Sequence, residues 1–202
     1  MGIEEKNRDL TSSQGRKSFF SELVRVAAFS FLAILTIRYF LFKPFYVKGA
    51  SMEPTYFEHE YLIIDELTYR FHNPDRGEVV VFRPPGNTRD FYIKRVIGLQ
   101  GETVKFVNGD VIVFNKEHPS GFKLDESIYL QTDIKQNETV VMKLGTEEYF
   151  VLGDNRMVSS DSRRFGPIKR DAIVGRVLLR GWPLDRFGFM HHTPHYTISD
   201  IK

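Results

Sequence analysis

The stretch FYIKRVI, Phe91 to Ile97, gives the clearest structural signal in this sequence, because β-branched and aromatic residues surround two adjacent cations. Such a composition is typical of a β-strand, in which successive side chains point to opposite faces of the sheet. Lys94 then shares a face with Tyr92 and Val96, whereas Arg95 lies on the other face with the remaining apolar residues. We therefore expect one of the two cations to point into apolar surroundings.

Lys94 is the more informative cation, because a buried lysine loses its charge readily and a buried arginine does not. A lysine pKa brought down from about 10.4 to near 7 corresponds to about 4 kcal/mol of burial cost, and the neutral amine is a general base. The chain also has a serine in the segment Gly49–Thr55. The two residues together predict that Lys94 activates Ser51 for acyl transfer.

Each of these residues also has an ordinary structural interpretation. A single lysine in a strand is usually solvated at a sheet edge, and a serine ahead of a proline is usually a turn residue. Neither Lys94 nor Ser51 alone therefore indicates an enzyme.

Three blocks of sequence, taken together, are more specific. They are SMEPT (Ser51–Thr55) after an apolar amino-terminal segment, YIKRVIG (Tyr92–Gly98), and GDNR (Gly153–Arg156) leading into SSDSR (Ser159–Arg163) and Gly166. In this order the blocks resemble the motifs of type I signal peptidases, which are membrane-anchored serine proteases that remove signal peptides from exported proteins. The resemblance extends from about Lys43 to Asp185, which is most of the chain.

The composition limits the fold and the function. With 202 residues, of which 42% are hydrophobic, the chain has room for one membrane segment and one domain of roughly 150 residues. The net charge of +2, with both signs spread along the sequence, does not indicate nucleic-acid binding. The lack of cysteine excludes disulfides, thiolate metal sites and a thiol nucleophile.

The segment from Phe19 to Phe42 is predicted to anchor the protein in a membrane. A helix over residues 20–42 is roughly 30 Å long at about 1.5 Å per residue, enough to cross the hydrocarbon core. A cleaved secretory signal and a buried helix of a soluble protein are the alternatives. The predicted organisation is a short cytoplasmic tail (1–18), a transmembrane helix (19–43) and an extracytoplasmic β-rich catalytic domain (44–202).

The orientation rests on the resemblance, because positive charges are nearly balanced on the two sides of the segment. The resemblance implies a single-pass protein of the plasma membrane with its catalytic domain outside the cytoplasm. About nine residues separate Phe42 from Ser51, so this tether spans at most about 30 Å and keeps the serine close to the bilayer. A later apolar cluster belongs either to the membrane interface or to the core and contains Trp182, Phe187, Phe189 and Met190.

Beyond the anchor the sequence is predicted to be mainly β. Short β-branched or aromatic runs are bounded by Gly, Pro, Asn and Asp, and Asn108-Gly109 between two of them predicts a hairpin. Residues 116–127 are expected to form a polar insertion. The expected strands are 61–64, 79–82, 91–97, 103–107, 111–114, 139–144, 149–152 and 173–179. The resemblance implies a curved antiparallel β-sheet built around the serine–lysine pair.

The expected mechanism is acyl transfer in two steps. Neutral Lys94 removes the proton from Ser51 Oγ, the oxygen attacks the scissile carbonyl, and Lys94 then activates a water for deacylation. The Ser51 N–H is the natural first donor to the oxyanion. Some family members carry a serine two residues before the nucleophile as a second donor, but this chain has Gly49 there.

The third block is expected to orient the catalytic pair. By resemblance, Ser159 hydrogen-bonds the Lys94 amine, Asp161 and Arg163 form an ion pair that braces the loop, and Asp154 pairs with Arg95. The alternative is a solvated loop without a catalytic role. Met157 and Val158 depart from the polar residues that many family members have at these positions.

The expected partners, by resemblance, are the lipid bilayer and exported preproteins with small residues at the first and third positions before the cut. An extended substrate would add a strand to a sheet edge. The residues expected to contact substrate flank the catalytic pair and are Ala50, Met52, Tyr92 and Ile93.

We expect no cofactor and no metal. His191, His192 and His195 have no nearby acidic partner, and Gly98-x-x-Gly101 lacks the lysine and hydroxyl of a phosphate-binding loop. Two other functions remain open at this point: a serine–lysine autoprotease of the repressor type, and an inactive anchored β domain that binds peptides.

Overall fold

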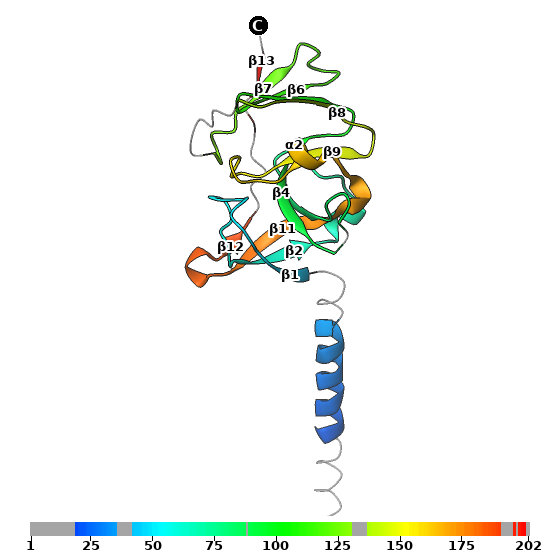
Figure 1. The fold of residues 1–202 in the computed structure, drawn as a ribbon. Coiled ribbons are helices and arrows are strands. Elements are labelled where there is room, and N and C mark those ends of the chain that lie inside the picture. Colours follow the sequence, from blue (N-terminus) through cyan, green and yellow to red (C-terminus); the bar gives the residue numbers. More distant parts are fainter. Residues whose placement is uncertain are drawn as a thin grey trace, which may run out of the picture. The chain divides into compact units, whose positions relative to one another are not determined.

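The computed structural model describes residues 19–35, 42–87, 89–130, 137–190, 196 and 198–200. The chain divides into two compact units, Met1–Phe42 and Lys43–Lys202. In the first unit residues 19–35 form a helix with exposed apolar side chains (Figure 1). Among the described helices, none is both long and apolar enough to span a bilayer.

The predicted membrane segment is only partly covered by these residues. The tail 1–18 and residues 36–41 lie outside the described residues. Strand β1 (Phe42–Tyr46) follows these residues and contains Lys43, which the sequence analysis placed at the end of the membrane helix.

The second unit is mainly β, and one curved antiparallel sheet carries most of its strands (Figure 1). Its order is β1-β2-β11-β3-β4-β9-β10, with β12 paired to β11. Register shifts within β11 bend this long strand, which pairs with β3 along one part and with β2 along another. The strands are β1, β2 (Tyr61–Asp65), β3 (Val79–Phe82), β4 (Tyr92–Gly98), β9 (Glu148–Leu152), β10 (Ile168–Lys169), β11 (Ile173–Trp182) and β12 (Gly188–Phe189).

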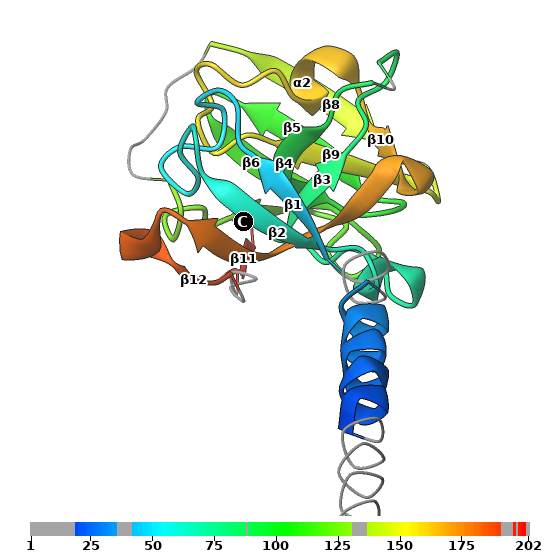
Figure 2. The same cartoon turned by 90° about the horizontal axis from the view of Figure 1, so that it is seen from below.

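A second sheet packs with the first and has the order β13-β7-β6-β5-β8 (Figure 2). Asn108 and Gly109 both have positive φ in the turn between β5 and β6, as the predicted hairpin requires. Its strands are β5 (Thr103–Val107), β6 (Asp110–Phe114), β7 (Phe122–Leu124), β8 (Thr139–Lys143) and β13 (Ile198–Asp200). The short helices of this unit are η1 (Thr68–Arg70), α2 (Ser162–Phe165), η2 (Arg170–Ala172) and η3 (Leu184–Arg186).

The two sheets pack closely at Gly98, a residue without a side chain. A Cβ at Gly98 of β4 would come 2.4 Å from Val104 Cγ2 on β5 and 2.9 Å from Phe150 Cβ on β9. Val104, Phe150 and Leu152 belong to one buried cluster that joins the sheets. Strand β4 is thus buried by close packing around its end.

Each predicted strand is present, with small differences at the ends, and the mainly β prediction is confirmed. The prediction of residues 116–127 as a polar insertion is wrong in part, because β7 lies within it and buries Phe122 and Leu124. The prediction missed strands that are short or paired with distant segments: β1, β7, β10, β12 and β13.

Candidate active site

Strand β4 presents two buried cations. Lys94 lies opposite Val80 of β3, and Arg95 lies opposite Val79 of β3 and Leu152 of β9. Both cations are only 4% exposed. The sequence predicted one buried cation, but the sheet is covered on both faces at this point, so both side chains are enclosed.

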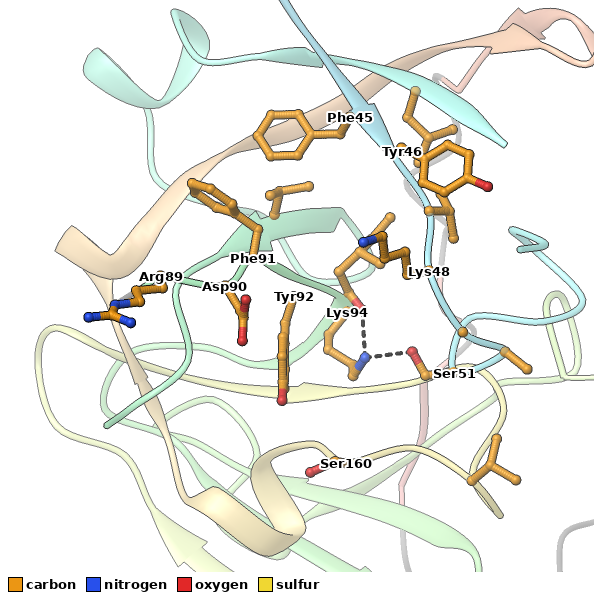
Figure 3. Close-up of a pocket in the computed structure, with 17 residues that line it drawn as sticks. Phe45, Tyr46, Lys48, Ser51, Arg89, Asp90, Phe91, Tyr92, Lys94 and Ser160 are labelled. Atoms are coloured by element: carbon orange, nitrogen blue, oxygen red, sulfur yellow. Dashed lines mark hydrogen bonds between the residues drawn. The ribbon is translucent and has the colours of Figure 1, made fainter. Parts of the chain in front are cut away.

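The Lys94 amine contacts Ser51. Lys94 Nζ lies 2.7 Å from Ser51 Oγ, and it donates a 2.8 Å hydrogen bond to the carbonyl oxygen of Ile93 (Figure 3). The amine also lies 5.6 Å from the centre of the Tyr92 ring. The predicted pair, which is separated along the sequence, is therefore brought into direct contact.

Burial lowers the Lys94 pKa to about 8, while the negative charges of Asp161 and Asp154 act in the opposite direction. Near pH 7 roughly one amine in ten is then neutral, and the fraction rises with pH. A lysine in this state can accept the proton of a neighbouring hydroxyl.

Residues of the third sequence block contact the turn that carries Ser51 and hold it in place. Asn155 N donates a 3.0 Å hydrogen bond to the Ser51 carbonyl oxygen. A Cβ at Gly153 would lie 2.5 Å from that same oxygen and 2.2 Å from Ser159 Oγ. Glycine is therefore needed at residue 153 for the two segments to approach.

A buried cluster joins all three sequence blocks. Arg95 donates to both carboxylate oxygens of Asp154, at 2.9 and 2.6 Å. Thr55, at the end of the Ser51 turn, donates to Asp154 at 2.5 Å. The Arg95 guanidinium also lies 4.0 Å from the centre of the Tyr129 ring. The expected pairing of Asp154 and Arg95 is thus present and also holds the Ser51 turn.

Asp161 and Arg163 form the other expected ion pair. Arg163 donates to the two carboxylate oxygens at 2.8 and 2.9 Å. Asp161 also caps α2 and accepts from Gly153 N at 3.1 Å. Burial acts to raise the Asp161 pKa, but the hydrogen bonds and charge of Arg163 hold it below its usual value.

Ser159, which was expected to hydrogen-bond the Lys94 amine, has different surroundings in the structure. Its side chain is buried, and within the described part of the chain its Oγ forms no hydrogen bond of normal geometry, although the hydroxyl lies close enough to Asp161 to help lower the pKa of that carboxyl. No hydrogen bond joins Ser159 to Lys94 in this structure, and the amine donates to the Ile93 carbonyl oxygen.

An open cavity of about 790 Å³ lies beside the pair. Ala50, Tyr92 and Ile93, which were expected to contact substrate, line it. Met52 does not line it, because its side chain is buried in a core cluster with Tyr56.

Other lining residues were missed by the sequence analysis. They come from the segments on either side of the cavity and include Phe45, Phe91 and Ser160 (Figure 3). Val158 lines the cavity as well. Phe45 and Phe91 touch edge to face, with ring centres 5.3 Å apart. The apolar residues that flank each catalytic block were the available signal for them.

The backbone next to Ser51 is open to a ligand. Gly49 has φ +81° and lines the cavity, where its N–H donates to Glu58 Oε1 at 3.0 Å. Within the described residues the Ser51 N–H has no protein acceptor. It is thus available as an oxyanion donor.

No group of three or more acidic or histidine side chains is placed to hold a metal within the described ranges. His191, His192 and His195 lie outside those ranges.

A buried serine–lysine pair beside an open cavity, in a mainly β domain, has the features of a serine hydrolase with a lysine base. Residues 20–182 match the family described as "Signal peptidase, peptidase S26". Since this match spans most of the sequence, the chain belongs to the signal peptidase family of peptidases.

Relatives with curated names agree with the family. A probable signal peptidase I-2 of Synechocystis sp. is 36% identical over 174 residues, which are 84% of this chain and 76% of the relative. A signal peptidase IB of Staphylococcus aureus is 31% identical over 185 residues, 86% of this chain and 95% of the relative. A crystal structure of a signal peptidase I from Enterococcus faecalis V583 covers 52% of this chain and 97% of its own, with 28% identity and a TM-score of 0.45.

Proposed function

We propose that this protein is a membrane-anchored serine endopeptidase that removes signal peptides from exported preproteins through a Ser51–Lys94 acyl-enzyme. The observation that supports it best is the 2.7 Å contact between Ser51 Oγ and the buried Lys94 amine beside an open cavity. The family and the names of the relatives supply the substrate class.

In the first step neutral Lys94 takes the proton of Ser51 as the hydroxyl oxygen attacks the scissile carbonyl. The amine thereby becomes an ammonium with three donors. The Ile93 carbonyl oxygen accepts one of them. The buried hydroxyl of Ser159 is the candidate acceptor for another, since it forms no hydrogen bond of normal geometry in the described residues. Ser159 would then stabilise the charged intermediate.

The tetrahedral intermediate places negative charge on the former carbonyl oxygen. The Ser51 N–H is the first donor to it. Lys94 next returns its proton to the leaving amine and takes one from a water that hydrolyses the acyl-enzyme.

The cavity suits an extended peptide with small side chains near the cut. Backbone segments 47–50 and 91–93 line it, and both offer main-chain groups for strand addition. Tyr92, Ile93 and Ala50 surround the reacting atoms with apolar surface. We propose that this surface accepts small side chains at the first and third positions before the cut.

Membrane anchoring is proposed through residues 19–43, with the second unit on the extracytoplasmic side. Trp182, Phe187 and Phe189 expose large apolar surface that suits a membrane interface, whereas Met190 packs against a core cluster.

The test is cleavage of a synthetic preprotein in detergent by the wild type, Ser51→Ala and Lys94→Ala. Ser127→Ala and Lys143→Ala, both at exposed positions, are matched controls. We expect wild-type turnover from the controls and loss of at least about 10³-fold in both site variants. Near wild-type turnover of either site variant would exclude the proposed pair.

A further inference from the structure

We propose that Arg163 is a positioning residue that helps the Lys94 amine to lose its proton, and so to act as a base, by neutralising the buried carboxylate of Asp161. This inference rests on the proposed function, because it takes Lys94 as the base. It assigns an electrostatic role to an ion pair that otherwise only braces a loop.

The geometry of the pair is that of a strong charge-assisted interaction. Asp161 is 0% exposed, and Arg163 reaches both of its oxygens at 2.8 and 2.9 Å. The guanidinium is held in turn by the Arg156 carbonyl oxygen at 2.8 Å and lies 5.0 Å from the centre of the Phe106 ring. Arginine keeps its charge in such surroundings, so the carboxylate is compensated at every working pH.

Asp161 belongs to the same buried region as the catalytic pair. Its Oδ2 accepts from Gly153 N at 3.1 Å. Gly153 also packs closely against the Ser51 backbone, since a Cβ added to it would lie 2.5 Å from the Ser51 carbonyl oxygen. Gly153 therefore contacts both the Asp161 carboxylate and the backbone of the nucleophile. In this buried region the negative charge of Asp161 acts on the Lys94 amine and raises its pKa.

Two carboxylates act on Lys94, and each of them is paired with an arginine. Burial lowers the pKa of Lys94, and Asp161 and Asp154 raise it, Asp161 having the larger effect of the two. Asp154 is neutralised by Arg95, and Asp161 by Arg163. Among the described residues, the groups in contact with the amine are neutral: the Ser51 hydroxyl, the Ile93 carbonyl oxygen and the Tyr92 ring. Lys48, Arg89 and Asp90 line the same cavity but are not among the groups that shift the Lys94 pKa.

Removal of Arg163 would leave Asp161 buried without its cation. The Lys94 ammonium is then the charge that this carboxylate would stabilise, and the base would stay protonated to higher pH. Arg163 is a better site for the test than Arg95. Arg95 neighbours Lys94 in β4 and also donates to the Gly77 carbonyl oxygen, so its loss would disturb the strand itself.

The experiment measures kcat/KM against pH for preprotein cleavage by the full chain in detergent. Its variants are Arg163→Met, Asp161→Asn and the double variant Asp161→Asn/Arg163→Met. Arg176→Met is the control, because it removes an arginine that pairs with Asp65 and Glu78, neither of which acts on Lys94.

We expect Arg163→Met to move the midpoint of the rise in kcat/KM upward by about one pH unit or more, a loss of roughly tenfold near pH 7 that is recovered at high pH. Asp161→Asn should move the midpoint below that of the wild type. The double variant should return it to the wild-type value or lower, and Arg176→Met should leave it unchanged.

A midpoint that stays fixed in Arg163→Met while activity falls equally at every pH would overturn the inference, as would a double variant that keeps the raised midpoint. If Arg163→Met does not fold, Asp161→Asn decides: an unchanged midpoint there also overturns it. A wild type that fails to cleave preprotein rejects the proposed function instead, so the two failures are distinct.

Discussion

Replacement of Lys94 by methionine is expected to stabilise the protein while abolishing its activity. Burial lowers the Lys94 pKa from 10.5 to about 8, so the folded state disfavours the ammonium that the unfolded chain carries. At about 1.4 kcal/mol per pKa unit, the wild type pays about 3 kcal/mol at pH 7 for this burial. Methionine is similar in size and carries no charge.

The sign of the pH dependence follows from the direction of the pKa change. With the folded-state pKa below the unfolded value, the cost is nearly complete at pH 7. It declines as the pH rises above 8 and falls below about 1 kcal/mol at pH 10. The variant also loses hydrogen bonds to Ser51 Oγ and the Ile93 carbonyl oxygen, a loss of about 1 kcal/mol that depends little on pH.

The assay is urea unfolding in detergent, followed by circular dichroism, of the wild type and Lys94→Met at pH 7 and pH 10. We expect the free energy of unfolding of the variant to exceed that of the wild type by about 2 kcal/mol at pH 7 and to lose this advantage at pH 10. Lys143→Met, at an exposed position of β8, should show no such change with pH. An identical difference between wild type and Lys94→Met at both pH values would refute the buried-amine reasoning.

Three further predictions concern the same site. The kcat/KM of the wild type should rise about tenfold from pH 7 to a plateau near pH 9 to 10 as Lys94 loses its proton, and a flat profile over that range would contradict a lysine base. Asp154→Asn leaves Arg95 without its buried carboxylate and should lower the free energy of unfolding by about 3–5 kcal/mol, as measured by urea titration; a change within about 1 kcal/mol would show that the pair is not buried. Gly153→Ala puts a methyl group 2.5 Å from the Ser51 carbonyl oxygen, so it should displace the serine and reduce kcat at least about tenfold for a stability cost of about 1–3 kcal/mol; unchanged kcat would exclude the close approach.

Much of the fold could be predicted from the sequence because strand alternation and turn residues are local signals. The strand at Tyr92–Gly98 and the hairpin at Asn108-Gly109 are examples, and both are present. Strands β7 and β13 could not be predicted in this way. They are three residues long each and pair with each other across a large sequence separation, so no local period marks them.

The site residues also fall into those that the sequence could predict and those that it could not. The sequence blocks indicated the Ser51–Lys94 pair and the two arginine–carboxylate pairs, and all three sets of residues are in contact. Met52 was expected at the substrate site but does not line the cavity, because position next to a serine does not say which side of a turn faces the cavity. That direction depends on the core cluster into which Met52 packs.

The sequence by itself determined the strand pattern, the turn at Asn108-Gly109 and the identity of a lone lysine among apolar residues. Only the tertiary structure decided that both faces of β4 are covered and that Gly153 lets two distant loops meet at Ser51. The reason is physical: period and turn chemistry depend on neighbours in the chain, whereas desolvation and charge compensation depend on neighbours in space. The chemical state of Lys94 follows from the second kind of neighbour.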